Sequence, residues 1–215
     1  MPKRDKAARP YNSDLRRRQA ADTRLRVVRA SQALFERQGY RATTFAQLAA
    51  EAGVSVKTVQ EHGPKSALLQ AAVELASFGV EGETDFFATD LGRAMLQVES
   101  ADELASMIGS AMLAINTPSA GLWMTFVSAA HADQELSRYH AHMLSLIRAQ
   151  VEHVLRYVDA RGWLRRDVPL DDLVEAFCII TCLETYVRFV EHDGIPPARY
   201  QEFVARTVRE TILAH

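Results

Sequence analysis

A short run of side chains around residue 57 has the chemistry that contacts DNA bases. Lys57 can donate to a guanine or a phosphate, and Gln60 can bond an adenine or a phosphate. Val56 and Thr58 can contact a thymine methyl group. Ser55 precedes the run and can cap a helix, whose N-terminus also favours a nearby phosphate. The spacing predicts a short helix with an exposed face that can enter a major groove.

Two further helices are expected to hold this one in place. Apolar residues at helical spacing predict a first helix over residues 22–38, which Gly39 ends. Thr44 and Gln47 form a capping box at the start of a second helix. The hydroxyls of Thr43 and Thr44 can also bind a phosphate. A helix, a tight turn and another helix in this order predict a helix–turn–helix head.

The remainder of the chain predicts helices only. Apolar residues recur at intervals of three and four, and a break is expected at Asn116–Pro118 because proline removes a helix hydrogen bond. The expected helices cover residues 65–79, 84–98, 101–115, 119–131, 133–160, 171–191 and 198–213. The fold class is therefore all-α, with an N-terminal three-helix head and a C-terminal helical bundle as its body.

Charge is distributed unevenly along the 215 residues. Residues 1–65 contain 14 Lys/Arg and 6 Asp/Glu, a net charge of +8, whereas residues 66–215 carry a net charge of −10. This asymmetry indicates a head that binds a polyanion and a body that does not. Residues 1–21 are expected to form a basic flexible arm, which is either a disordered tail or a segment that lies along the DNA backbone or minor groove. Alternatively, the segment around Arg16–Arg18 extends the first helix backwards.

A series of residues between positions 24 and 69 matches the pattern of a known family. The matching residues are Ala33, Leu34, Phe35, Gly39, Tyr40, Thr43, Thr44, Leu48, Ala49, Ala52, Gly53, Val54, Ser55, Thr58, Val59, Lys65, Leu68 and Leu69. This segment resembles the DNA-binding head of the tetracycline-repressor (TetR) family of bacterial regulators. The resemblance implies a DNA-binding domain at residues 22–64 and an effector-binding and dimerisation domain at residues 65–215.

The resemblance also implies which residues contact double-stranded operator DNA. They are Arg41, Thr43, Thr44, Ser55, Val56, Lys57, Thr58, Gln60, His62 and Lys65. Two features depart from the family's pattern. Gln60 stands where a tyrosine is usual, and the turn Glu61–Lys65 is one residue short and lacks the phenylalanine that packs between the first and fourth helices. His62 could fill part of that space.

By the same resemblance, the body should form a homodimer and hold an effector pocket. The expected pocket residues are Phe86, Met95, Met107, Met112, Trp123, Phe126, Met143, Phe177, Cys178 and Tyr186. Such a lining predicts a small hydrophobic effector. The alternative interpretation is that most of these residues are plain core. Helices at about 171–191 and 198–213 should pair with their copies, which would place two recognition helices roughly 34–36 Å apart on one DNA face.

These observations predict a transcriptional repressor that a small hydrophobic effector releases from a palindromic operator. The alternatives are a regulator of this type without an effector, an activator, or a small helical head that contacts protein instead of DNA. No motif of a hydrolase, metalloprotease, phosphate loop or dinucleotide-binding fold occurs, so we expect no enzyme and no cofactor.

Histidine and cysteine give weaker signals. His131, His140, His142 and His153 lack zinc-site spacing, so we expect no metal site. Cys178 and Cys182 could sense oxidants, but buried free cysteine usually acts as a small apolar residue. No apolar run approaches the length of a membrane span, so we expect a cytoplasmic protein that is nucleoid-associated when bound to DNA.

Overall fold

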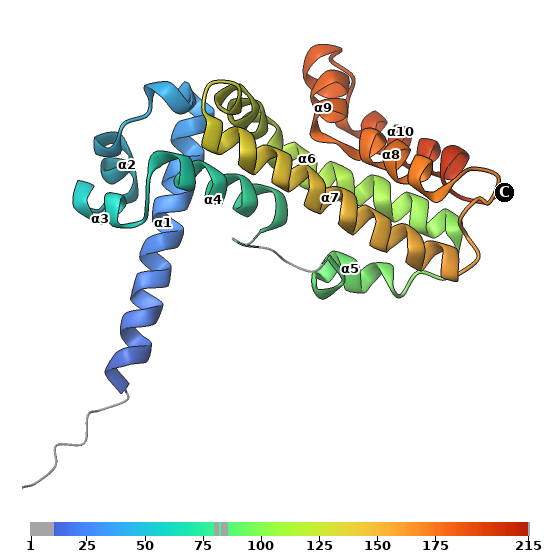
Figure 1. Ribbon diagram of the computed structural model, residues 1–215, viewed down its shortest axis with the longest axis horizontal. Coiled ribbons are helices and arrows are strands. Elements are labelled where there is room, and N and C mark those ends of the chain that lie inside the picture. Colours follow the sequence, from blue (N-terminus) through green and yellow to red (C-terminus); the bar gives the residue numbers. More distant parts are fainter. Residues whose placement is uncertain (1–10, 80–81, 83–85, 215) are drawn as a thin grey trace, which may run out of the picture. The chain divides into compact units, whose positions relative to one another are not determined.

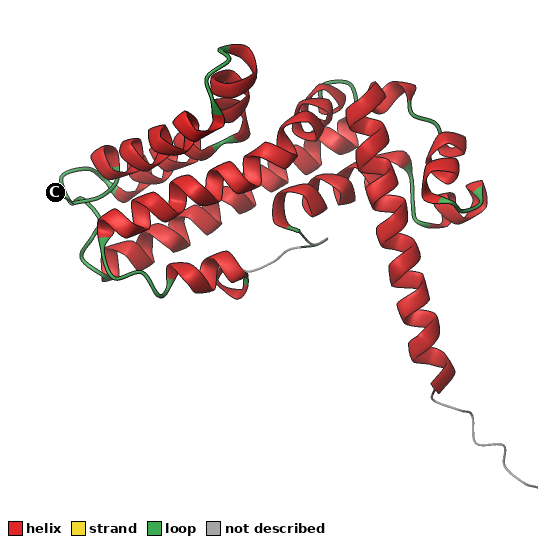
Figure 2. Ribbon diagram, turned by 180° about the vertical axis from the view of Figure 1, so that it is seen from behind, coloured by secondary structure: helices red, strands yellow, loops and turns green. Residues whose placement is uncertain are grey.

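The computed structural model describes residues 11–79, 82 and 86–214 (Figures 1 and 2). Every regular element in these residues is helical, apart from one isolated β-bridge between Leu164 and Leu213. The chain divides into two compact units at residues 69 and 70. The all-α fold, with an N-terminal helix–turn–helix head and a helical body, is therefore confirmed. None of the described helices combines the length and apolar character that crossing a bilayer requires.

The head begins with a long helix, α1 (Tyr11–Ala42), which has a non-helical backbone at Gly39. Its apolar stripe packs into the core of the head, where Val28 and Phe35 are fully buried. Gly39 has a φ of +81°, a conformation that costs glycine little. The predicted end of the first helix at Gly39 thus coincides with this kink. The beginning differs, because the flexible arm predicted for residues 1–21 is helical from Tyr11 onwards.

The second and third helices, α2 (Phe45–Ala52) and α3 (Val56–Glu61), begin at the predicted caps. The Thr44 hydroxyl accepts from the backbone N–H of Gln47, and the Gln47 side chain accepts from the backbone N–H of Thr44, which completes the capping box. Gly53 ends α2 in the left-handed conformation, with a φ of 65°. Each cap satisfies N–H groups that the first turn of a helix otherwise leaves without a partner.

The fourth helix, α4 (Lys65–Phe78), begins in the head and continues into the body. The body is the second compact unit of the chain and starts at Gln70. In the body, a short 3-10 helix (Phe86–Ala88) and α5 (Asp90–Met95) lead to a hairpin of two long helices, α6 (Ala101–Ala130) and α7 (Gln134–Ala160) (Figure 1). The two helices pack antiparallel around a core that includes Leu104, Leu155 and Val158.

The predicted break at Asn116–Pro118 is wrong, because α6 runs through it as one helix with Pro118 inside. A proline removes one helix N–H, which affects the carbonyl group four residues earlier. The hydroxyls of Thr117 and Ser119 donate to the carbonyl oxygens of Leu113 and Ile115, on either side of that group. Buried residues before and after Pro118 hold both halves of α6 in the core, so packing outweighs the lost hydrogen bond.

The predicted helix over residues 171–191 is also wrong as a single element. It consists of α8 (Leu170–Thr181), a one-turn α9 (Leu183–Tyr186) and a π-helical segment, η2 (Val187–His192). Cys182, at the break, has an extended backbone with φ −65° and ψ 156°. Side chains satisfy the carbonyl groups there, because Thr185 donates to the Ile179 oxygen at 2.6 Å and Asn116 donates to the Thr181 oxygen at 3.2 Å.

The last helix, α10 (Pro197–Thr211), packs along α6. Tyr200, Val204 and Val208 form its buried stripe, and all three are fully buried. Gly109 allows the close approach, since a Cβ atom there would lie 2.6 Å from the backbone oxygen of Gln201. The Tyr200 hydroxyl accepts from Asn116 Nδ2 at 2.8 Å, which satisfies two polar groups inside the core.

Candidate nucleic-acid interface

The outer face of α3 is free within the described part of the head. Val59 is the one fully buried residue of this helix, and it fixes α3 against the head core. Val56, Lys57 and Gln60 are exposed on the opposite side, and Val56 is 40% exposed. An exposed valine between a cation and an amide provides both apolar and hydrogen-bonding contacts, as a major groove requires.

Backbone N–H groups at the start of α3 have a fixed direction. Ser55 Oγ accepts from the Thr58 N–H at 3.0 Å and also lies 2.9 Å from the Thr58 hydroxyl. Thr58 is half-buried, so its hydroxyl takes part in the cap as well as reaching the surface. The cap makes α3 rigid at the end that would meet the DNA, which reduces the entropy cost of binding.

Thr43 and Thr44 lie next to each other in sequence but differ in environment. Thr44 is exposed at the start of α2, together with the neighbouring Arg41. Thr43 is 1% exposed, and its hydroxyl donates to the Gly39 oxygen at 2.8 Å. In this conformation, Thr43 therefore shapes the turn before α2, whereas Thr44 lies at the surface with its hydroxyl bonded to Gln47, to whose Oε1 it donates at 3.0 Å.

Lys65 is half-buried at the first turn of α4. Its Nζ donates to the backbone oxygens of Tyr40 at 2.7 Å and Thr43 at 3.1 Å. The ammonium group also lies 4.4 Å from the centroid of the Tyr40 ring. Partial burial lowers the pKa of Lys65 from its ordinary value. The side chain thus binds the end of α1 to the start of α4 and positions the segment before α2.

The short turn after α3 is held by a residue that the sequence analysis did not single out. Arg24, on α1, donates to the carbonyl oxygen of His62 at 2.8 Å. His62 is half-buried and caps the end of α3. Arg24 lies beside the apolar stripe of α1, and the sequence gives little sign of its structural role, because most arginines in such positions are simply solvated. Here its guanidinium ties α1 to the turn where the usual phenylalanine is missing.

The predicted effector-pocket residues lie mainly within packed core. Met95, Phe177 and Tyr186 belong to the main cluster of buried residues in the body, and Met107, Met112 and Cys178 pack against it. Trp123, Phe126 and Met143 are also buried. The side chain of Phe86 lies outside the described residues. The chain thus brings together most of the predicted apolar side chains, in the form of core packing.

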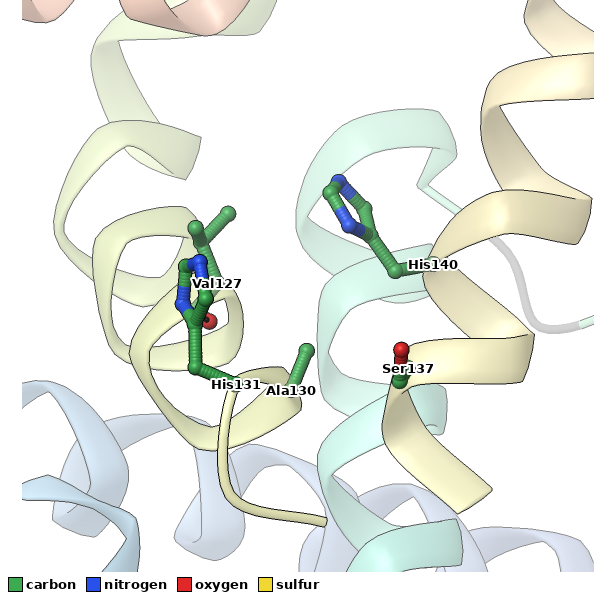
Figure 3. A pocket seen from close by; sticks show the side chains of 5 residues that line it. All are labelled: Val127, Ala130, His131, Ser137 and His140. Atoms are coloured by element: carbon green, nitrogen blue, oxygen red, sulfur yellow. Dashed lines mark hydrogen bonds between the residues drawn. The ribbon is translucent and has the colours of Figure 1, made fainter. Parts of the chain in front are cut away.

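A hollow of about 270 Å³ lies elsewhere, between the end of α6 and the start of α7. It is lined by Val127, Ala130, His131, Ser137 and His140. Figure 3 shows the imidazole rings of His131, at the C-cap of α6, and His140, on α7, on opposite sides of this hollow. The Nδ1 atom of His131 lies 2.8 Å from the Val127 oxygen. None of the predicted pocket residues lines this hollow.

His140, which lines the hollow, belongs to a continuous group of aromatic side chains. The His140 ring packs edge-on against Trp123 and Phe126, each with a centroid distance of 5.4 Å. The Phe126 ring meets Tyr139 at 5.8 Å, and the Tyr139 hydroxyl donates to Glu74 Oε1 at 2.6 Å. Spacing along α7 could have revealed His140, which lies on the same helical face as the buried Leu136 and Met143.

The Tyr139–Glu74 hydrogen bond joins α7 to the body part of α4. Burial raises the pKa of Tyr139 well above its ordinary value, and the hydrogen bond to the Glu74 carboxylate adds to this shift. Tyr139 therefore stays a donor at neutral pH. A second hydrogen bond, from Ser119 Oγ to the Ala76 oxygen at 3.0 Å, holds the same part of α4 against α6.

No group of three or more potential metal ligands occurs among the described residues.

Comparisons with known proteins agree with this architecture. Residues 27–72 match the family model described as bacterial regulatory proteins of the tetR family. A protein from Saccharomonospora viridis in complex with choline has a similar fold, with a TM-score of 0.68 and 16% identity over 91% of this chain and 100% of that one. No match was found among curated proteins.

Two further solved structures are similar. A complex of SmeT with triclosan has a TM-score of 0.68 and 18% identity, and covers 89% of this chain and 92% of that one. NalD, the secondary repressor of the MexAB-OprM multidrug efflux pump in Pseudomonas aeruginosa, has a TM-score of 0.63 and 13% identity, and covers 89% of this chain and 96% of that one. At these identities the likeness shows the fold.

The capped α2–turn–α3 unit and the helical body define a helix–turn–helix DNA-binding regulator of transcription. Residues 27–72, which form the core of the head, match the tetR family of bacterial regulatory proteins, and the whole chain has the fold of such regulators. Regulators of this family bind operator DNA, dimerise and bind small molecules, and they are generally not enzymes.

Proposed function

We propose that this protein is a repressor that binds a palindromic operator as a homodimer and leaves it when a small hydrophobic effector binds the body. It acts in the cytoplasm, on nucleoid DNA. The observation that carries the proposal is the exposed face of α3, formed by Val56, Lys57 and Gln60, on a rigidly capped helix. Arg41, Thr44 and the N-terminus of α3 contact phosphates, while Lys57 and Gln60 contact bases.

A dimer is needed because a single short helix contacts too few base pairs to select an operator. The proposed interface consists of α8 with its continuation to His192, and of α10. Ile179 on α8 supports this choice, since it is 66% exposed within the part of the chain that the structure describes. Pairing with a second copy would bury this side chain and place the two α3 helices in successive major grooves.

The proposed path from effector to DNA runs along α4. At the head end of this helix, Lys65 is bonded to Tyr40 and Thr43. At the body end, Glu74 is bonded to Tyr139, whose ring contacts Phe126, a residue of the predicted pocket set. An effector that repacks Trp123 or Phe126 would shift Tyr139, and with it α4. The effector can change DNA affinity only by as much as it prefers one position of α4 over the other.

A hydrophobic effector is favoured by the composition of the predicted pocket set and by the triclosan complex of a protein of the same fold. Phe126, Met143 and Phe177 provide apolar surface, and methionine adapts to ligands of varied shape. A similar fold holds triclosan, a largely apolar phenol, in SmeT, whereas the Saccharomonospora protein holds choline, a cation, so the fold accommodates both chemistries. Because the predicted residues are closely packed here, binding requires them to move apart, as in a pocket that opens with its ligand.

The decisive experiment measures DNA binding of the purified full-length protein at physiological salt. Fluorescence anisotropy compares DNA from upstream of its own gene with random DNA of the same length. We expect at least about 1,000-fold tighter binding to the specific DNA. Equal affinities would contradict the proposal. Addition of triclosan or choline, as probes of effector chemistry, should weaken specific binding for at least one compound and raise the melting temperature.

A broad panel of lipophilic compounds extends this test. If no compound shifts the melting temperature while specific DNA binding is intact, the result would favour a regulator without an effector. Tighter operator binding on addition of a compound would favour an activator or a corepressed repressor. Both outcomes leave the DNA-binding function of the head unchanged.

A further inference from the structure

The N-terminal part of α1 continues far beyond the head core. Residues 15–22 are all exposed, including Leu15 at 51%, and full burial on α1 begins only at Val27. Figures 1 and 2 show this part of the helix projecting past α2 and α3, which belong to the same unit. From Tyr11 to Leu25 the helix rises roughly 22 Å at 1.5 Å per residue.

None of residues 15–22 is buried in the head. Helices of this length are marginally stable in water on their own, and most helices in proteins gain their stability from packing. The rest of α1 supplies a nucleus but no cover for these turns. A helix that is exposed over its whole circumference is therefore best explained by a partner that binds it.

The charges on this segment indicate the chemistry of the partner. Residues 15–22 contain three arginines, Arg16, Arg17 and Arg18, and one acidic residue, Asp22. At 100° per residue, three consecutive arginines spread over about 200° of the helix surface. A compact carboxylate would meet only one of them, whereas the phosphates of a curved backbone can meet all three.

We propose that the segment 15–22 of α1 is a second DNA-binding surface, which holds the phosphate backbone outside the base pairs that α3 contacts. The inference rests on the proposed function, and it adds a contact that strengthens binding without selecting sequence. The segment and α3 lie in one unit, so a duplex bound at α3 has backbone within reach of a helix of this length. The competing occupant, the acidic body of a second copy, is an outcome of the test.

The test uses the full-length protein with Arg16, Arg17 and Arg18 all changed to glutamine, which removes three charges and keeps helix propensity. The matched control changes the exposed Arg93, Arg156 and Arg166 of the body to glutamine. Affinity for specific and random DNA is measured over a range of salt concentrations. We expect this triple glutamine variant, the arm variant, to bind both DNAs at least about tenfold more weakly. The slope of the logarithm of affinity against the logarithm of salt concentration should be smaller by up to about 2.7 per protomer. The control should match the wild type.

Amide hydrogen exchange gives an independent readout. DNA should slow exchange at residues 15–22 in the wild type. An arm variant with wild-type affinity and slope, or wild-type exchange that DNA leaves unchanged, would overturn the inference. So would a variant that changes the dimer dissociation constant but not DNA binding, which would assign the segment to a second copy. If the wild type binds specific and random DNA equally, the proposed function fails, while the salt slopes on random DNA still decide this inference.

Discussion

Lys65 Nζ lies 2.7 Å from the carbonyl oxygen of Tyr40 and 4.4 Å from the centroid of the Tyr40 ring. Lys65, which is expected to contact a DNA phosphate, therefore also links the end of α1 to the start of α4. Its ammonium group satisfies two backbone oxygens at the kinked end of α1, and a third N–H remains available for a phosphate. The observed internal contacts and the expected phosphate contact thus involve the same side chain.

Replacing Lys65 by methionine should lower both stability and DNA affinity. Loss of two hydrogen bonds from a charged donor, together with the cation–π contact, should cost about 2 kcal/mol of unfolding free energy. The exposed Lys57 is the matched control, because Lys57→Met removes the same charge without internal bonds. Urea unfolding and DNA anisotropy check both variants. Equal unfolding free energies for the two variants would show that the Lys65 contacts contribute nothing.

Changing Arg24 to methionine should loosen the end of α3. The variant loses the hydrogen bond to the His62 oxygen, at a cost of about 1–2 kcal/mol, and should lose more affinity for specific than for random DNA. Arg26→Met removes the same charge from an exposed position of the same helix. The two variants are compared by thermal melting and anisotropy. Indistinguishable effects would mean that Arg24 acts through its charge alone.

The Tyr139–Glu74 hydrogen bond predicts a particular pH dependence. Because burial and this bond raise the pKa of Tyr139, the folded state keeps the phenol proton where the unfolded chain would lose it. The stabilisation is therefore complete below the unfolded pKa of about 10 and falls as pH rises above it. Urea unfolding should show that Tyr139→Phe costs about 1–2 kcal/mol at neutral pH and less above pH 10. Tyr157→Phe is the control, and a cost for Tyr139→Phe that stays constant with pH would contradict the account.

Gly109→Ala should destabilise the body. Its Cβ atom would lie 2.6 Å from the Gln201 oxygen, so α6 and α10 must separate, which we expect to cost about 1–3 kcal/mol. Gly121 is an exposed glycine in the same helix, and its replacement by alanine should instead stabilise the protein by up to about 1 kcal/mol. Thermal melting separates the two. A Gly109→Ala protein as stable as the wild type would show that α10 does not pack as described.

The sequence predicted best what neighbouring residues determine. Thr44 with Gln47, Ser55, and Gly53 place the caps of α2 and α3 through contacts only three or four residues long. Breaks in the body depend on distant partners instead. Asn116, two residues before Pro118, bonds Tyr200, which lies 84 residues away. Local pattern alone could not show that packing would outweigh a proline.

The candidate sites follow the same division. Exposure of Val56, Lys57 and Gln60 follows from the helical period around the buried Val59. The internal bonds of Thr43 and Lys65 depend on how α1, α2 and α4 meet. In the sequence, the residue types threonine and lysine therefore suggested only a phosphate contact. Likewise, the hollow between His131 and His140 forms where two helices end and begin, a relationship that spacing within either helix cannot reveal.

The central claim is that the exposed face of α3 selects a DNA sequence. It is tested most directly by the affinity ratio between DNA from upstream of the gene and random DNA, measured for the wild type and for a Lys57→Ala, Gln60→Ala double variant. We expect a wild-type ratio of at least about 1,000, which the variant lowers by about 10- to 100-fold while binding to random DNA changes much less. A wild-type ratio near one, or a ratio that the variant leaves unchanged, would contradict it.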